Sequence, residues 1–177
     1  VVELTGGGAT AGSIASGGGT IVVNADDVAI DNPAGTAIDA GSGRVTIRPA
    51  DQADAAREID LGSNTPGRLG ITADEFNRIT TSDVVQIGDT FAGDAFLTAG
   101  ISPAHFSTLR INSSGSLTTT AEANTIAIEN LAIDVDDEIG ASGPRISTSA
   151  VNLAAQSRVA GDVYLAETAD GVTVTTV

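Results

Sequence analysis

Short stretches in which branched apolar residues alternate with small or polar residues recur along most of this chain. Examples are "RVTIRP", "VVQIGD", "TLRIN", "LAIDVD" and "GVTVTT". Strict alternation predicts strands with one buried face. Clusters of Gly, Ser, Asn, Asp and Pro, which favour turns, separate the stretches. We therefore expect an all-β chain built from many short strands.

The spacing of the residues expected to face inward constrains how these strands are arranged. One series of branched residues recurs at intervals of 24, 22, 20 and 21 residues, and a second recurs at 18 and 19. Two interleaved series with similar periods predict a solenoid, with coils stacked about 4.8 Å apart. We expect about eight coils of roughly 20 residues. The first series comprises Ile87, Ile111, Ile133, Leu153 and Val174, and the second Ile128, Ile146 and Leu165.

An antiparallel β-sandwich is the alternative fold, because short strands with frequent turns are typical of it as well. Two features favour the solenoid. Asp170-Gly171 is the one tight Asn-Gly or Asp-Gly turn between alternating stretches, whereas hairpins favour such turns. Four Phe, one Tyr and no Trp suit a narrow core of stacked aliphatic side chains.

The expected organisation has two parts. Residues 1–20 are Gly-rich and predict an irregular first coil or a linker, and residues 21–177 form the solenoid segment. Neither end shows the polar cap that a terminal coil needs to cover its open backbone edge. We therefore expect a fragment of a longer chain or a stacking protomer, whose partners are further coils of the same chain or other copies stacked end to end.

Charge and hydropathy exclude two classes of partner. Eight Arg and no Lys stand against 23 acidic residues, giving a formal charge of −15. Such a chain repels nucleic acid, whose binding depends on cationic side chains that displace counterions. No run approaches the ~20 apolar residues that a membrane-spanning helix needs. We expect neither nucleic-acid binding nor membrane insertion.

Residues 44–89 carry a resemblance to a known family. The order "RVTIRPA", "EIDLGS" and "GRLGITADEFNRITTSDVVQIGD" resembles a segment of very large bacterial surface proteins of the filamentous haemagglutinin type. The resemblance implies a right-handed parallel β-helix and an extracellular or cell-surface location in bacteria. It also implies a role as adhesin, stalk or filament, with host or cell-surface glycans or proteins as partners. It brings no catalytic residues with it.

One helix signal lies inside this segment. Thr72-Ala73-Asp74-Glu75 has the spacing of a capping box, in which the Thr and Glu side chains each satisfy a backbone N–H at a helix start. We expect a short helical elbow near residues 72–79. Phe76 and Ile79 would cover the interior, while Asp74, Glu75 and Arg78 would face water.

Candidate binding and catalytic residues have plainer interpretations. His105, the only histidine, lacks a nearby Gly-x-Ser-x-Gly nucleophile pattern and is expected in a surface loop. The stretch Asp134-Val135-Asp136-Asp137-Glu138 is rich in the oxygen ligands of Ca²⁺ but lacks the EF-hand pattern. We expect a solvated acidic face there. The glycosylation pattern Asn112-Ser113-Ser114 is expected to be a plain turn.

These interpretations leave no catalytic, cofactor-binding or metal-binding residue, and the chain is expected not to be an enzyme. A β-helix polysaccharide lyase or hydrolase is the alternative function. It would need two convergent carboxylates in a groove, with aromatic rings stacking on the sugars. Tyr164 is the one strand aromatic that the pattern leaves exposed. The acidic residues lie scattered at turns and outward positions, which favours a scaffold.

Overall fold

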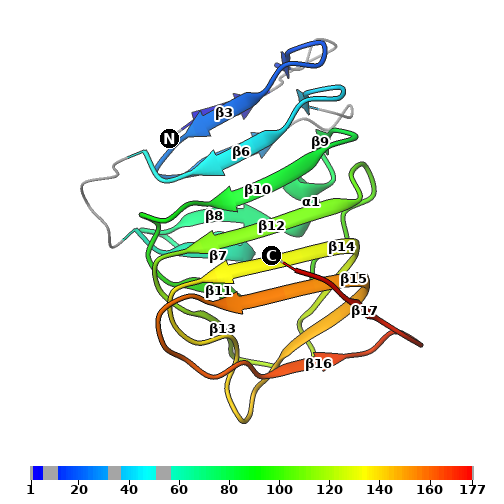
Figure 1. Cartoon of the computed structure of the whole chain (residues 1–177). Coiled ribbons are helices and arrows are strands. Elements are labelled where there is room, and N and C mark those ends of the chain that lie inside the picture. Colours follow the sequence, from blue (N-terminus) through cyan, green and yellow to red (C-terminus); the bar gives the residue numbers. More distant parts are fainter. Residues whose placement is uncertain (1, 6–11, 32–36, 51–56, 177) are drawn as a thin grey trace.

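The chain folds into a parallel β-solenoid. The computed structural model describes residues 2–5, 12–31, 37–50 and 57–176. All strand pairs within these ranges are parallel, and about seven turns stack along one axis (Figure 1). The front strands in Figure 1 run from right to left while the chain descends, so the coil is right-handed. The predicted parallel β-helix is confirmed, and the β-sandwich alternative is wrong.

The strands form one large sheet and three smaller ones. The large sheet contains β3 (Ile21–Asn24), β6 (Val45–Arg48), β10 (Val84–Gly88), β12 (Thr108–Ser113), β14 (Thr125–Val135), β15 (Ile146–Ser157), β16 (Leu165–Glu167) and β17 (Thr173–Val174). A second contains β7 (Ile59–Gly62), β8 (Leu69–Thr72), β11 (Ala95–Leu97) and β13 (Leu117–Thr119). The others pair β1 (Val2–Thr5) with β4 (Val28–Asp31), and β5 (Ile38–Asp39) with β2 (Ile14–Ala15) and β9 (Ile79–Thr80).

Ladders of stacked aliphatic side chains form the core. Ile87, Ile111 and Ile133 occupy one ladder, as predicted from their spacing. That ladder continues to Ala155, whereas Leu153 and Val174 belong to the neighbouring ladder. The prediction was wrong there because Ala155 is not branched, so the alternation pointed to Leu153 two residues earlier.

One of the two pairings predicted by the second series is observed. Ile146 pairs with Leu165 as expected, but Ile128 pairs with Ala150. Both β14 and β15 run around a corner, at Glu129 and Val151, where the inward phase shifts by one residue. Regular alternation cannot be extrapolated across such a corner.

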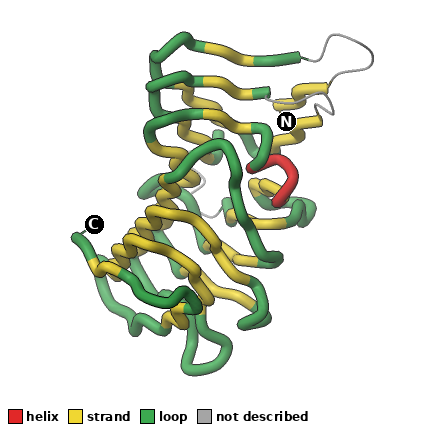
Figure 2. Tube along the Cα trace, turned by 90° about the vertical axis from the view of Figure 1, so that its right-hand side faces the viewer, coloured by secondary structure: helices red, strands yellow, loops and turns green. Residues whose placement is uncertain are grey.

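The third coil is the longest and explains why there are about seven coils rather than eight. Ile47 pairs directly with Ile87, so the chain between these neighbouring rungs is far longer than the expected coil of roughly 20 residues. This coil holds both β7 and β8, which are parallel neighbours in one sheet. It also holds the helix α1 (Ala73–Phe76), red in Figure 2.

The helix begins as predicted and is shorter than predicted. Thr72 caps its start, and the capping box with Glu75 is complete. Phe76 and Ile79 are fully buried. The expectation that Glu75 faces water is wrong, because its side chain is buried against β4 and accepts a hydrogen bond from the Ile30 amide at 2.7 Å.

The N-terminal strands join the solenoid by pairing. β1 pairs with β4, and β2 pairs with β5. We call β1, β2 and β3 the first coil, and β16 and β17 the last coil.

Within the described ranges, no helix is long and apolar enough to cross a membrane.

Candidate functional site

Two of the residues considered from the sequence lie at the surface. His105 is exposed in the loop before β12, as predicted. The half-buried Tyr164 donates a hydrogen bond from its hydroxyl to Asp162 at 3.0 Å. This hydrogen bond and the negative charge of Asp162 raise the pKa of the tyrosine hydroxyl. Neither arrangement resembles a nucleophile held by a general base.

The acidic stretch is only partly solvated, contrary to the prediction. Asp137 and Glu138 are exposed, but Asp134 is 6% exposed. Its Oδ2 lies 2.5 Å from Nη2 of Arg110, and its Oδ1 lies 3.1 Å from Nη1 of Arg158. One arginine comes from the preceding coil and the other from the following coil, so the local pattern could not pair them with Asp134. Asp134 is an ion-pair partner within the sheet face rather than a free calcium ligand.

Arg158 ties three coils together. Its Nε donates to Oδ1 of Asp136 at 2.6 Å on β14's coil. Its other nitrogens reach back to β12, where they donate to Asn112 Oδ1 at 3.1 Å and to the Ser113 carbonyl at 2.7 Å. A planar guanidinium with several donors suits such bridging between strands. These hydrogen bonds stabilise the stack and engage Nε, Nη1 and Nη2 of Arg158.

A second arginine makes a similar tie near the other end. Arg48 donates from Nε to Asn24 Oδ1 at 2.8 Å and from Nη1 to Asp89 Oδ2 at 3.2 Å. It therefore links the first, second and third coils along the same edge of the large sheet. Within the described chain, no group of three or more His, Asp or Glu side chains is arranged to hold a metal ion.

The glycosylation pattern is not a turn. Asn112 and Ser113 lie at the end of β12, and they are 6% and 0% exposed. The Ser113 hydroxyl donates to the Gly93 carbonyl at 2.6 Å. These side chains make contacts between coils from a strand end, which corrects the prediction of a plain turn.

Asp60 is a buried carboxylate that accepts four hydrogen bonds, and no local sequence pattern pointed to it. It lies on β7 and is fully buried. Its Oδ2 accepts hydrogen bonds from the Thr65 amide at 2.9 Å, the Thr65 hydroxyl at 2.5 Å and the Ser63 hydroxyl at 3.1 Å. Its Oδ1 accepts from the Thr98 hydroxyl.

These contacts determine the ionisation of Asp60. Burial alone would raise its pKa, but the hydrogen bonds from Thr65, Thr98 and Ser63 outweigh burial and hold the pKa below its ordinary value of 3.8. The six-residue connection from β7 to β8 folds around this carboxylate. Asp60 therefore organises the unusual short crossover between two parallel strands, which normally takes a dozen residues or more.

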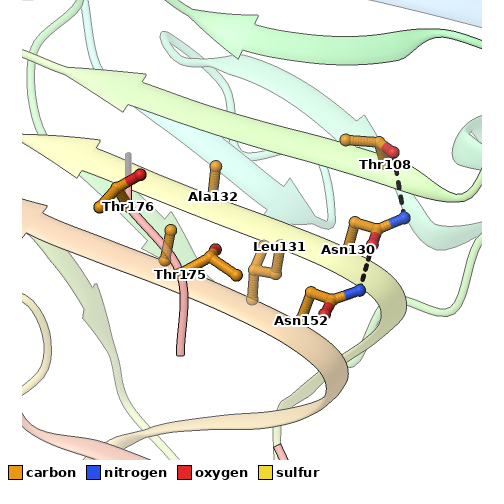
Figure 3. A pocket seen from close by; sticks show the side chains of 8 residues that line it. Thr108, Asn130, Leu131, Ala132, Asn152, Thr175 and Thr176 are labelled. Carbon is orange, nitrogen blue, oxygen red and sulfur yellow. Dashed lines mark hydrogen bonds between the residues drawn. The ribbon is translucent and has the colours of Figure 1, made fainter. Parts of the chain in front are cut away.

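An open depression of about 310 Å³ lies on the large sheet (Figure 3). Asn152 donates to Asn130 Oδ1 at 2.7 Å, and Asn130 donates to the Thr108 hydroxyl at 3.3 Å, so the amides form a ladder across three coils. No aromatic ring lines the depression, although sugar-binding grooves commonly use one. Its lining comprises Thr108, Asn130, Leu131, Ala132, Asn152, Ala154, Thr175 and Thr176.

The last coil has an open edge. β16 and β17 each pair with β15, and neither has a strand on its far side in the described structure. Val159, Val163 and Val174 are 74%, 46% and 79% exposed there. Glu167 holds this coil in place by accepting hydrogen bonds from the Thr148 hydroxyl and the Ala150 amide. Burial opposes ionisation of Glu167, but these bonds and two from neighbouring amides lower its pKa.

Comparison of the chain with protein-family models, with curated proteins and with solved structures found no match. A functional interpretation therefore depends on the sequence and the geometry of the chain. The geometry consists of aliphatic ladders inside, arginine and asparagine ties across the outer face, and an open edge at the last coil.

Proposed function

We propose that this chain is a structural β-solenoid segment of a large secreted or cell-surface bacterial protein. It serves adhesion or forms part of an extracellular filament or stalk. Its location is extracellular, and its partners are further coils or copies, with host or cell-surface glycans or proteins as ligands. The resemblance of residues 44–89 to filamentous haemagglutinin-type proteins motivates this proposal.

The observation that supports it most directly is the bracing between coils. Arg158 spans three coils and Arg48 spans three others. Backbone pairing adds parallel hydrogen-bonded ladders between neighbouring coils of the large sheet. Such a body resists bending and can hold a distal binding region away from a cell.

A display experiment tests the proposal. The chain is expressed on the surface of a non-adherent bacterium, with a distal epitope tag, beside the core variant Ile111→Asp, which buries a charge and disrupts the ladder. Adherence to host cells supports the adhesion role, and tag exposure beyond the bacterial surface without adherence supports the stalk role. Both properties are expected to be lost in the variant.

The competing lyase or hydrolase function gives a different result. It requires that the purified chain cleave a polysaccharide, with turnover lost on Asp134→Asn. Such turnover would overturn the structural proposal. So would a display strain whose distal tag remains inaccessible and which adheres no better than Ile111→Asp.

A further inference from the structure

The corners of the first two coils show how one coil seats on the next. Residues 16–20 connect β2 to β3, and residues 40–44 connect β5 to β6. Each corner has five residues, with a glycine at the fourth position, Gly19 and Gly43. A Cβ on Gly43 would lie 2.2 Å from the Gly19 carbonyl oxygen. The second corner therefore needs glycine because the corner above it lies so close.

The last coil returns to this corner form. Residues 168–172 connect β16 to β17, again five residues with a glycine, Gly171, at the fourth position. The coils between differ, since three residues connect β9 to β10, and β14 and β15 run through the corner without a break. The corner between β16 and β17 thus matches in length and glycine position the corner between β2 and β3.

The single chain leaves space for a Cβ atom at Gly19. A Cβ on Gly19 would meet its nearest neighbour, within its own corner, at 3.8 Å, which is ordinary van der Waals contact. No such space exists at Gly43, where a Cβ would clash with the Gly19 carbonyl. A stacked corner above Gly19 would therefore impose on it the restriction that Gly43 already experiences from Gly19.

The charge distribution permits a second copy to bind at the open edge of the last coil. The net charge of −15 opposes association of whole chains. Residues 12–24, which include β2, the first corner and β3, nevertheless contain no charged residue. The acidic last coil, with Asp162, Glu167 and Asp170, therefore meets no like charge in this part of the first coil. The remaining long-range repulsion is screened by salt.

We propose that the first coil of a second copy of this chain seats on the open edge of the last coil, so that copies assemble head to tail. Val174 would then continue its ladder into Ile21 of the next copy, which begins the same ladder in its own chain through Val45 and Val85. A heterologous contact of this kind does not close on itself and produces filaments. The inference deepens the proposed filament role and rests on it.

Sedimentation velocity and negative-stain microscopy test the proposal across protein concentration, at low salt and at high salt. The parent chain is expected to form longer particles as concentration and salt rise. Gly19→Ala is expected to weaken association by about tenfold or more while leaving the melting temperature of the monomer unchanged. Gly171→Ala is the matched control, because a Cβ there meets nothing within 4 Å and the variant should assemble like the parent.

Val174→Arg gives a second, independent variant. Its side chain is 79% exposed in the single chain, so folding should persist while a cation at the ladder position blocks stacking. Equal assembly of the parent and both interface variants would overturn the proposal. A parent chain that stays monomeric under all conditions would also overturn it. Rod-like monomers that pass the display experiment would leave the proposed structural function standing.

Discussion

Replacement of Asp60 gives the sharpest test of how the third coil is held together. In Asp60→Ala the Thr65 amide loses its buried acceptor, and three hydroxyl donors lose theirs. The Ser63 and Thr98 hydroxyls lie 2.8 Å apart and can bond each other, and Thr98 also reaches the Leu61 carbonyl at 3.1 Å. The Thr65 amide and hydroxyl therefore account for most of the loss.

The magnitude follows from these contacts. A buried donor left without a partner costs about 1–3 kcal/mol, and a hydrogen bond to a charged group contributes about 1.5–3 kcal/mol. Part of that is regained because a charge no longer needs to be buried. We expect Asp60→Ala to lower the free energy of unfolding by about 3 kcal/mol, or the melting temperature by about 6–12 °C. Asp60→Asn keeps an acceptor oxygen and should lose about 1–1.5 kcal/mol.

The pH dependence provides an independent readout. Because the folded-state pKa of Asp60 lies below its ordinary value of 3.8, its ionisation stabilises the fold above that value. The contribution is lost as the pH falls from about 4 through the folded-state pKa. Asp60→Asn should therefore remove a component of the acid destabilisation expected of the parent.

Urea unfolding followed by circular dichroism at neutral pH and at a pH below the ordinary pKa of aspartate measures both effects. Asp83→Asn, which removes the same charge at an exposed position, is the matched control. The reasoning would be refuted if Asp60→Ala stayed within about 0.5 kcal/mol of this control. It would also be refuted if Asp60→Asn kept the full pH dependence of the parent.

Three further substitutions test other contacts. Gly43→Ala places a Cβ 2.2 Å from the Gly19 carbonyl and should cost about 2 kcal/mol or more by calorimetry, whereas Gly19→Ala should leave the melting temperature unchanged. Arg158→Ala should lower the free energy of unfolding in urea by about 1–2 kcal/mol. Each ion pair of the partly exposed guanidinium is modest, but the substitution leaves Asp134 with Arg110 alone. An unchanged midpoint would contradict the bracing role. Glu167→Gln should speed amide exchange at Ala150 about tenfold, while Asp170→Asn, an exposed change on the same coil, should not.

Sequence reasoning succeeded where the signal was local. Alternation is a property of neighbouring residues, so the strands that carry Ile87, Ile111 and Ile133 could be read from it. The capping box depends on residues three apart, and it located the start of α1. These features are encoded within a few residues of where they act.

The errors at the acidic side chains share a physical cause, which is that the partner lies in another coil. Asp134 seemed solvated because its two arginines lie one coil before it and one coil after it. Asp60 carries no signal in its own strand, since Thr98 reaches it from 38 residues further along. Only the coil lengths determine these neighbours, and the length of the third coil could not be inferred from a period of about 20.

The helix shows how the solenoid accommodates that irregular coil. A strand inside a solenoid pairs its backbone with the coils on both sides, and β4 has β1 on one side. On its other side α1 approaches, and there the Glu75 carboxylate accepts from the Ile30 amide while Arg78 donates to the Ile30 carbonyl. Side chains thus satisfy the backbone groups that a regular strand would have paired. Because Glu75 simultaneously completes the capping box, one carboxylate both starts the helix and attaches it to β4, which allows the long third coil to join the stack without interrupting it.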